Sequence, residues 1–246
     1  MIYLDPADFA VSEEISAGGY EADEVELVTR LIRPTDTVID IGANIGYFTV
    51  LFCDVAREGT VHSFEPSPKT CSFLRKNIES NGFKNAHVYE MAVGDRDGHA
   101  QIFINEYNKG DNRLYPSFGA KGVDIRVAML DSVIPPDTKV DFIKMDTQGY
   151  EVYALRGMRR VVRDSPDLRM IVECWPKGLK KAGSSIEEFF SELENAGFSW
   201  RIIDGGELRT VSKEAFIAKF PTEKDDYANL LCWRGKKLPH SVVIST

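Results

Sequence analysis

Four acidic residues stand at or near the ends of short apolar runs that are typical of buried strands: Asp40, Glu65, Asp146 and Glu173. The carboxyl ends of parallel strands meet at one edge of a sheet, and ligands bind in the crevice outside them. We therefore expect the four carboxylates to surround one ligand site. A carboxylate at Glu65 is placed to accept both hydroxyls of a ribose, and one at Asp40 is suited to bind an ammonium group.

The turn that follows Asp40 indicates the kind of ligand. Gly42 and Gly46 bracket this turn, which joins a β-branched run to an apolar helix that begins at Tyr47. A glycine lets a ligand approach the backbone, and the helix start offers unpaired N–H groups. The order Gly-Ala-Asn-Ile-Gly departs from the Gly-x-Gly-x-x-Gly spacing of dinucleotide sites. A phosphate-free, zwitterionic nucleoside fits better, and S-adenosylmethionine is the obvious candidate.

The adenine ring of such a cofactor needs a flat apolar wall and backbone hydrogen-bonding groups. The end of the third expected strand, Ala92-Val93, lies where this wall is needed. The predicted cofactor-binding residues are therefore Asp40, Gly42, Ala43, Asn44, Gly46, Glu65, Pro66, Ala92 and Val93.

If such a cofactor donated its methyl group to an alcohol, the site would need a group that takes up the hydroxyl proton. Asp146 lies where an acceptor would enter, so we expect it to be this base, with Glu173 as the alternative. Lys144 points to the same face, two residues earlier. A buried lysine is costly unless paired, so Lys144 either forms an ion pair with Asp146 or Glu173 or orients the acceptor. No histidine is a strong base candidate, because His62 is expected to be a satisfied core residue.

The acceptor site is expected beside residues 105 to 122, which connect two alternating runs, 101–104 and 123–130, that predict a hairpin. A connection this long is uncommon unless it has a function. Its aromatic side chains, Asn112 and Arg113 are expected to form an acceptor pocket or a lid, and simple disorder is the alternative. The predicted substrate-binding residues are Asn112, Arg113 and Trp175.

Buried strand-like runs alternate five times with helical segments, and a terminal pair of strands follows. This pattern predicts an α/β fold with a doubly wound, Rossmann-like, seven-stranded, mostly parallel sheet and helices on both faces. The seven expected strands span residues 37–41, 60–65, 86–93, 140–146, 168–174, 200–203 and 229–233. We expect one domain over residues 1–246. Within it, residues 1–33 form an N-terminal cap or lid and a helix, residues 99–134 an inserted hairpin and loop, and residues 236–246 a peripheral tail.

Composition narrows the classes of partner. The net charge of 30 − 38 = −8 disfavours nucleic acid, because phosphate contacts need a basic surface. The four cysteines lie far apart, which indicates reduced core residues of a cytoplasmic protein. No signal peptide and no run of bilayer length is found. No metal is expected, although Asp146 with Glu173 could in principle hold a divalent ion.

Several stretches carry a resemblance to a known family: Val38 to Gly46, Phe64-Glu65-Pro66, Ala92 to Asp95, Leu130-Asp131 and the Lys-x-Asp-x-x-Gly-x-Glu block from Lys144 to Glu151. From about Tyr20 to Glu173 the chain resembles the FkbM-family methyltransferases. The resemblance implies a class I methyltransferase fold and S-adenosylmethionine-dependent O-methylation of a hydroxyl of a sugar, glycan or secondary metabolite, with S-adenosylhomocysteine as product. Gln148 departs from the family pattern, which often has Glu there, so a carboxylate role at this position is in doubt.

Three other classes of protein are less well supported by the sequence. A nicotinamide-dependent oxidoreductase is disfavoured by the glycine spacing, and a non-catalytic nucleoside-binding module by the grouping of Lys144, Asp146 and Glu173. A methyltransferase of RNA or protein is weakened by the acidic composition. The acceptor, the methylated hydroxyl and the oligomeric state stay open.

Overall fold

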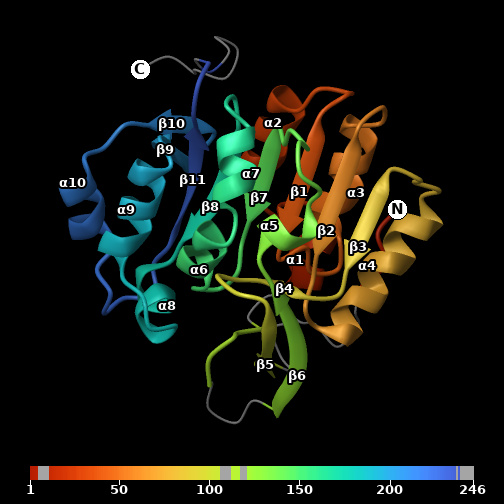
Figure 1. Ribbon diagram of the computed structural model, residues 1–246, viewed down its shortest axis with the longest axis horizontal. Helices are drawn as coiled ribbons and strands as arrows, with labels where there is room; N and C mark the ends of the chain where they lie inside the picture. The colour runs from red at the N-terminus through yellow and green to blue at the C-terminus, as the bar shows by residue number, and fades with distance from the viewer. Residues whose placement is uncertain (5–10, 106–111, 117–120, 237, 239–246) are drawn as a thin grey trace.

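The computed structural model describes residues 1–4, 11–105, 112–116, 121–236 and 238. A large sheet has helices on both faces, and a small sheet projects from the edge at which its parallel strands end (Figure 1). The four cysteines are buried and none is in a disulfide. In the described part of the chain, no helix is long and apolar enough to cross a membrane.

The large sheet has eight strands, and its centre is parallel. In spatial order the strands are β10 (Glu207–Arg209), β9 (Ser199–Asp204), β11 (Ala228–Trp233), β8 (Arg169–Cys174), β7 (Phe142–Met145), β1 (Thr37–Ile41), β2 (Thr60–Phe64) and β3 (Ala86–Tyr89). Strands β8 to β3 pair in parallel, whereas β11 is antiparallel to β8 and β9, and β10 is antiparallel to β9. The doubly wound α/β prediction is confirmed, but the sheet has eight strands and not seven, because β10 returns beside β9 through Gly205-Gly206.

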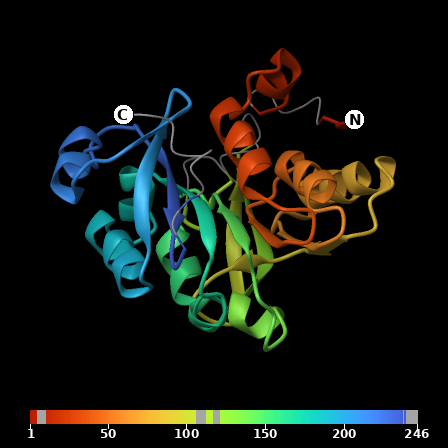
Figure 2. The same ribbon diagram turned by 90° about the horizontal axis from the view of Figure 1, so that it is seen from above.

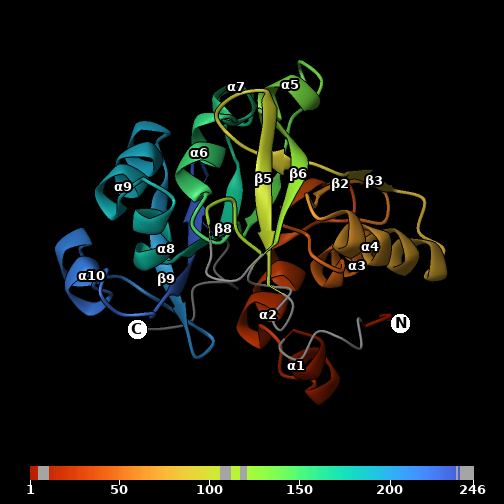
Figure 3. The same cartoon turned by 90° about the horizontal axis from the view of Figure 1, so that it is seen from below.

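The small sheet accounts for the predicted hairpin. Its strands are β4 (Ala92–Val93), β6 (Lys121–Ala128) and β5 (Gly98–Ile104), in that spatial order. β5 and β6 are antiparallel, as expected. The single strand expected over residues 86–93 is instead divided between the two sheets, and its second part, β4, pairs with β6. Seen from below, β5 and β6 lie in front of the large sheet, at the edge where the parallel strands end (Figure 3).

The helices divide between the two faces of the large sheet. They are α1 (Val11–Ala17), α2 (Ala22–Leu31), α3 (Tyr47–Val55), α4 (Pro68–Ser80), α5 (Leu130–Val133), α6 (Glu151–Arg156), α7 (Arg159–Asp164), α8 (Pro176–Lys181), α9 (Ile186–Asn195) and α10 (Lys213–Lys219). The red and orange helices of the N-terminal half lie on one side, and the green and cyan ones on the other (Figure 2). α1 was not predicted as a separate helix.

Alternation along the central strands decides which side chains face which helices. Val38 of β1 and Phe142 of β7 belong to the apolar cluster that α2 and α3 cover, whereas Ile39 and Ile143 face the opposite cluster. Two residues further on, Asp40 and Lys144 therefore face the α2–α3 side. The two are paired in register across the strands, so a carboxylate and an ammonium group lie side by side at the end of the sheet.

The N-terminal residues are attached to α4 next to the glycine turn. Tyr3 N donates to Asn77 Oδ1, and Asn77 Nδ2 donates to Tyr3 O at 3.0 Å and to Ile45 O at 2.7 Å. Asn77 is fully buried. One side chain therefore holds both the chain's first residues and the turn between β1 and α3.

Candidate functional site

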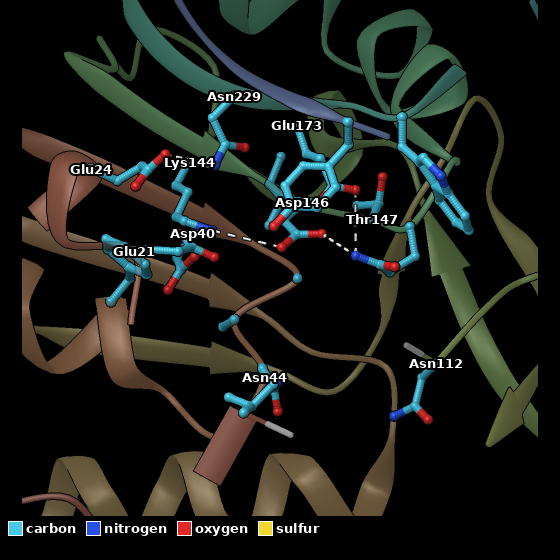
Figure 4. Close-up of a pocket in the computed structure, with 18 of the residues that line it drawn as sticks. Glu21, Glu24, Asp40, Asn44, Asn112, Lys144, Asp146, Thr147, Glu173 and Asn229 are labelled. Atoms are coloured by element: carbon cyan, nitrogen blue, oxygen red, sulfur yellow. Dashed lines mark hydrogen bonds and ion pairs between the residues drawn. The ribbon is translucent and has the colours of Figure 1, made fainter. Parts of the chain in front are cut away.

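A cavity of about 810 Å³ opens at the carboxyl ends of β1, β2, β7 and β8. Its volume is in the usual range for a small-molecule site. All predicted cofactor-binding residues except Gly46 line it, as do all predicted catalytic and substrate-binding residues. The structure thus brings together side chains that are far apart in the sequence. Figure 4 shows several of them around this cavity.

The turn after β1 contains two glycines with positive φ that have close neighbours. Gly42 has φ +82°, and a Cβ there would lie 1.8 Å from the carbonyl oxygen of Asp146. Gly46 has φ +91° at the start of α3, and its Cβ would lie 2.6 Å from Leu74 Cδ1. Asn44 also adopts a left-handed conformation, with φ 51°. Its Oδ1 is buried and has no hydrogen-bond partner among the described residues.

Asp40 lies beneath this turn, buried to 1% exposure. Its Oδ2 accepts a 2.6 Å hydrogen bond from Thr49 Oγ1 of α3. Burial raises the pKa of Asp40 to about 6, although Lys144 and the Thr49 bond oppose this rise. A positively charged group of a ligand would favour the ionised carboxylate.

Glu65, directly after β2, accepts backbone hydrogen bonds of 2.9 Å from Asn44 and Ser67, one on each carboxylate oxygen. These bonds connect the turns after β1 and β2. Burial raises the pKa of Glu65 to about 7. Each oxygen has a second lone pair, so the carboxylate can still accept ribose hydroxyls.

The predicted adenine wall is β4. Ala92 and Val93 are only 5% and 2% exposed, and both line the cavity. Ile102 of β5 packs with Ala92 in the small sheet and also lines the cavity. The small sheet therefore extends the apolar wall beyond the strand that the sequence indicated.

Lys144 is 6% exposed and is held by two carboxylates. Its Nζ lies 3.3 Å from Glu21 Oε2 and 3.9 Å from Asp146 Oδ2, and 4.5 Å from the centre of the Phe48 ring. Burial lowers the pKa of Lys144, but Glu21, Asp146 and Asp40 raise it more, so the net shift is upward. The expected ion pair with Asp146 is confirmed, and the alternative pairing with Glu173 is replaced by Glu21.

Glu21 is the residue that sequence reasoning missed. It precedes α2 in a left-handed conformation, with φ 44° and ψ 46°. Its partner Lys144 is 123 positions away, and no spacing or motif connects the two. The only signal was indirect: a buried lysine requires carboxylates, and the N-terminal residues are rich in them.

Asp146 and Glu173 are joined by the side chain of Gln148. Its Nε2 donates to Asp146 Oδ1 at 2.8 Å and to Glu173 Oε1 at 3.4 Å. Glu173 is 8% exposed, and burial, reinforced by Asp146 and Glu151, raises its pKa well above the usual range. A carboxyl with a raised pKa beside a cavity is suited to exchange protons near neutral pH.

Glu151, the last residue of the Lys-x-Asp-x-x-Gly-x-Glu block, shapes the loop rather than the cavity. Its Oε1 accepts hydrogen bonds from Thr147 N and Thr147 Oγ1, both at 2.9 Å, and from Gly149 N at 3.1 Å. Glu151 is fully buried, and burial raises its pKa to about 7. Gln148 and Gly149 have φ 52° and 98°, and Glu151 holds this irregular turn in place.

The three predicted substrate-binding residues all line the cavity, and two of them, Arg113 and Trp175, are in contact. The Arg113 guanidinium lies 4.7 Å from the centre of the Trp175 ring, and Trp175 is only 6% exposed. Asn112 Oδ1 accepts a 3.0 Å hydrogen bond from Asn105 N. Residues 106–111 and 117–120 of the expected acceptor loop lie outside the described residues. Trp175 is therefore covered by Arg113 and is not an open stacking surface.

The remaining candidates for proton transfer or metal binding are the histidines and the acidic side chains of the site. His62 is a core residue, as predicted: its Nδ1 lies 3.1 Å from Tyr89 Oη, and burial lowers its pKa to about 4. Within the ranges that the structure describes, no group of three His, Cys, Asp or Glu side chains is arranged to hold a metal ion.

Known proteins share features of this sequence and fold. The methyltransferase FkbM domain family matches residues 40–199. Methyltransferase 1 of Beauveria bassiana (strain ARSEF 2860) is 25% identical over 189 residues, covering 68% of this chain and 74% of that protein. The 31-O-demethyl-FK506 methyltransferase FkbM of Streptomyces tacrolimicus is 43% identical over 68 residues, covering 27% of this chain and 25% of that protein. The Streptococcus mutans protein SMU.1697c, crystallised with SAH, has a TM-score of 0.52 at 10% identity, covering 86% of this chain and 95% of that chain.

Proposed function

Because this chain belongs to the FkbM methyltransferase family and is an S-adenosylmethionine-dependent methyltransferase, we propose that it methylates a hydroxyl group of a sugar, glycan or secondary metabolite. The Streptomyces tacrolimicus relative supports transfer to oxygen, since its name describes a substrate that lacks an O-methyl group. The net charge of −8 supports a small-molecule or glycan acceptor over nucleic acid. We also propose a cytoplasmic location, on the basis of the unpaired cysteines.

The residues of the glycine turn fit the cofactor. The unpartnered Asn44 Oδ1 is a free acceptor at the cavity wall, and Gly42 keeps the backbone open at the point where β1 ends. Glu65 is assigned to the ribose hydroxyls, and Ala92 and Val93 to the adenine ring. S-adenosylmethionine, when bound, supplies a methyl group on a positively charged sulfur.

The pair of Asp146 and Glu173 carries the proposal of transfer to a hydroxyl. An alcohol must lose its proton, and we assign that proton to Glu173. Both oxygens of Asp146 are engaged, one with Gln148 and the other with Lys144. Among the described residues, Glu173 has only the longer Gln148 bond; its pKa is raised, and it lines the cavity. Asp146 and Lys144 are then assigned to orient the acceptor hydroxyl toward Glu173.

The test has a binding step and a turnover step. Thermal unfolding is followed with S-adenosylhomocysteine, S-adenosylmethionine and NAD in parallel. A ligand at about a hundred times its dissociation constant adds roughly 2.7 kcal/mol to the folded state. We expect stabilisation by the two adenosyl compounds and none by NAD. The reverse result would support an oxidoreductase.

Turnover is then measured with S-adenosylmethionine carrying a labelled methyl group and a panel of hydroxylated sugars and alicyclic alcohols. We expect label in an ether product with wild type and a 10²–10⁴-fold lower rate with Glu173→Gln, as for loss of a general base. Label on a nitrogen atom would overturn the proposal of O-methylation. Binding without transfer to any acceptor would favour a non-catalytic nucleoside-binding module.

A further inference from the structure

Tyr227 is an exposed aromatic residue in the wall of the cavity. It lies directly before β11, beyond residue 199, where the family match ends. It is 56% exposed and lines the cavity. Among the described residues, the other exposed aromatic residue is Tyr3, at 37%, which does not line the cavity. A single exposed aromatic side chain on a protein surface is ordinary, but one inside a ligand cavity is available to bind a ligand.

The other aromatic side chains of the cavity wall are buried or already in contact with another ring or a cation. The rings of Tyr20 and Tyr47 meet edge to face, with 5.3 Å between their centres. Trp175 is 6% exposed and is covered by the Arg113 guanidinium. Three further aromatic residues are at most 8% exposed: Phe48, Phe64 and Phe220. Tyr227 has no ring or cation contact with any residue that the structure describes, so its face is open.

The pairing of β11 with β8 places Tyr227 beside the carboxyl that we assign as the base. Asn229 is paired with Glu173, and Ala228 with Cys174, across these antiparallel strands. Residues two apart on a strand share a face, so Tyr227 is on the same face as Asn229. It is then a diagonal neighbour of Glu173, at roughly 7–8 Å between Cα atoms, which an aromatic side chain can span.

The carboxylates of the cavity act on the Tyr227 hydroxyl. Burial raises the pKa of Tyr227 to about 12, and Glu173, Glu21 and Asp146 add to this rise. Tyr227 is therefore a neutral phenol near neutral pH, within range of several negative charges. The same charges would repel an anionic ligand on its ring. A ligand that rests on Tyr227 is thus expected to be uncharged.

The groups around Tyr227 match the two kinds of surface on a sugar ring. A pyranose has a face of C–H groups, which can pack on an aromatic ring, and an edge of hydroxyls, which need hydrogen-bond partners. Glu173 and Asn229 supply polar atoms on the same face of the sheet as Tyr227. Asn229 is held in place, because its Nδ2 donates a 2.6 Å hydrogen bond to Glu24 Oε1 of α2.

We propose that an uncharged sugar ring stacks its C–H face on Tyr227 and so brings one of its hydroxyls to Glu173. This inference rests on the proposed transfer to a hydroxyl, and it names the residue that selects a ring as the acceptor. It places this selectivity outside the stretch that the family match covers.

Rings and open chains that carry the same kinds of hydroxyl separate stacking from simple access to the base. The probes are the methyl pyranosides of glucose, galactose, mannose and rhamnose and the alditols of the same four sugars, with S-adenosylmethionine labelled in its methyl group. We expect wild type to use at least one pyranoside with a kcat/KM at least tenfold above that of its alditol. Tyr227→Ala should raise the KM of that pyranoside about tenfold, with kcat within a few-fold, and should remove the preference.

Two variants serve as controls. Tyr227→Phe retains the ring without the hydroxyl and should keep the preference. Tyr3→Ala removes the other exposed aromatic side chain, which lies against Lys76, and should leave both KM values unchanged. The affinity of Tyr227→Ala for S-adenosylhomocysteine, measured by calorimetry, should equal that of wild type. If Tyr227→Ala does not fold, Tyr227→Leu replaces it, because leucine is apolar but has no flat face.

Several results would overturn the proposal. An unchanged KM in Tyr227→Ala, or an equal rise for the ring and the open chain, would show that no sugar ring stacks on Tyr227. Methylation of alditols without methylation of any pyranoside would also overturn it, while transfer to a hydroxyl would stand. If wild type binds S-adenosylhomocysteine but methylates no hydroxyl of these probes or of the wider panel above, the proposed function itself has failed.

Discussion

Gln148 Nε2 donates a 2.8 Å hydrogen bond to Asp146 Oδ1. The same amide nitrogen reaches Glu173 Oε1 at 3.4 Å, so a neutral donor stands between two carboxylates that would otherwise repel each other. This arrangement explains why Gln fits a position where the resembling family often has Glu. A carboxylate there would be a third negative charge in the same group, and it would have no proton to donate at neutral pH.

The first prediction concerns the Gln148 amide, which bridges the carboxylates of Asp146 and Glu173. Gln148→Glu adds a like charge beside Asp146 and Glu173, which raises the pKa of the proton-accepting carboxyl further. Glu173 must be ionised to accept a proton, so turnover rises with pH through its pKa. We expect the pH–rate profile of the variant to move upward by on the order of one pH unit. Gln148→Leu, which removes the donor without adding charge, is the control. If the pH–rate profile of Gln148→Glu is the same as that of wild type, Gln148 does not affect the proton transfer.

The two carboxylates of the bridge should respond differently to loss of charge. Asp146→Asn retains a hydrogen-bonding oxygen and loses an ion-pair partner of Lys144, whereas Glu173→Gln removes the assigned base. We expect Glu173→Gln to reduce kcat by about 10²–10⁴-fold and Asp146→Asn by less. Because Asp146→Asn removes an ion-pair partner of Lys144 and Glu173 is buried, melting curves of both variants come first. The opposite ranking in folded protein would make Asp146 the base, as the sequence alone had indicated.

Glu65 should act on binding and not on chemistry. Glu65→Gln retains the shape but loses a charge-assisted acceptor for the ribose, which costs about 1.5–3 kcal/mol. We expect the affinity for S-adenosylhomocysteine to fall accordingly while kcat at saturating cofactor stays within a few-fold. Calorimetry and saturation kinetics measure the two quantities. A large loss of kcat with normal affinity would show that Glu65 is misassigned.

Glu151 gives a prediction about stability. Its pKa of about 7 in the folded protein is above the ordinary value of 4.5, so the folded state binds the proton more tightly than the unfolded state. Its contribution to stability is therefore lost as pH rises from 4.5 to about 7, by about 3 kcal/mol in all. Glu151→Gln removes this dependence. We expect the stability of wild type relative to the variant to decline over that pH window, as measured by chemical denaturation. A constant difference would contradict the raised pKa.

The sequence was most informative where local pattern and topology act together. Short apolar runs predict buried strands, and parallel strands end at one edge, so the sequence predicts that Asp40, Glu65, Asp146 and Glu173 meet at that edge. The hairpin of β5 and β6 follows from alternation in the same way. Each of these signals lies within a short stretch of sequence, and the parallel sheet then brings the carboxyl ends of the strands together.

What the sequence did not indicate depends on contacts without a local signal. Glu21 reaches Lys144 from a different part of the chain, and nothing in its surroundings marks it as buried. The division of residues 86–93 between two sheets depends on β6 as a neighbour for β4. The strand β10 is different, because the Gly205-Gly206 pair before it is itself a local hairpin signal.

The contact between Gly42 and the Asp146 carbonyl has a consequence for anyone who wishes to change the acceptor. The turn assigned to the donor and the loop that begins at Asp146 are in direct backbone contact, with no room for a single methyl group. Sequence changes in residues 146–149 will therefore be transmitted to the donor side, and selection for a new acceptor at these positions will tend to lower donor affinity. Exchange of β5 and β6 would affect the donor side as well, because Ile102 of β5 packs with Ala92 in the wall assigned to the adenine ring.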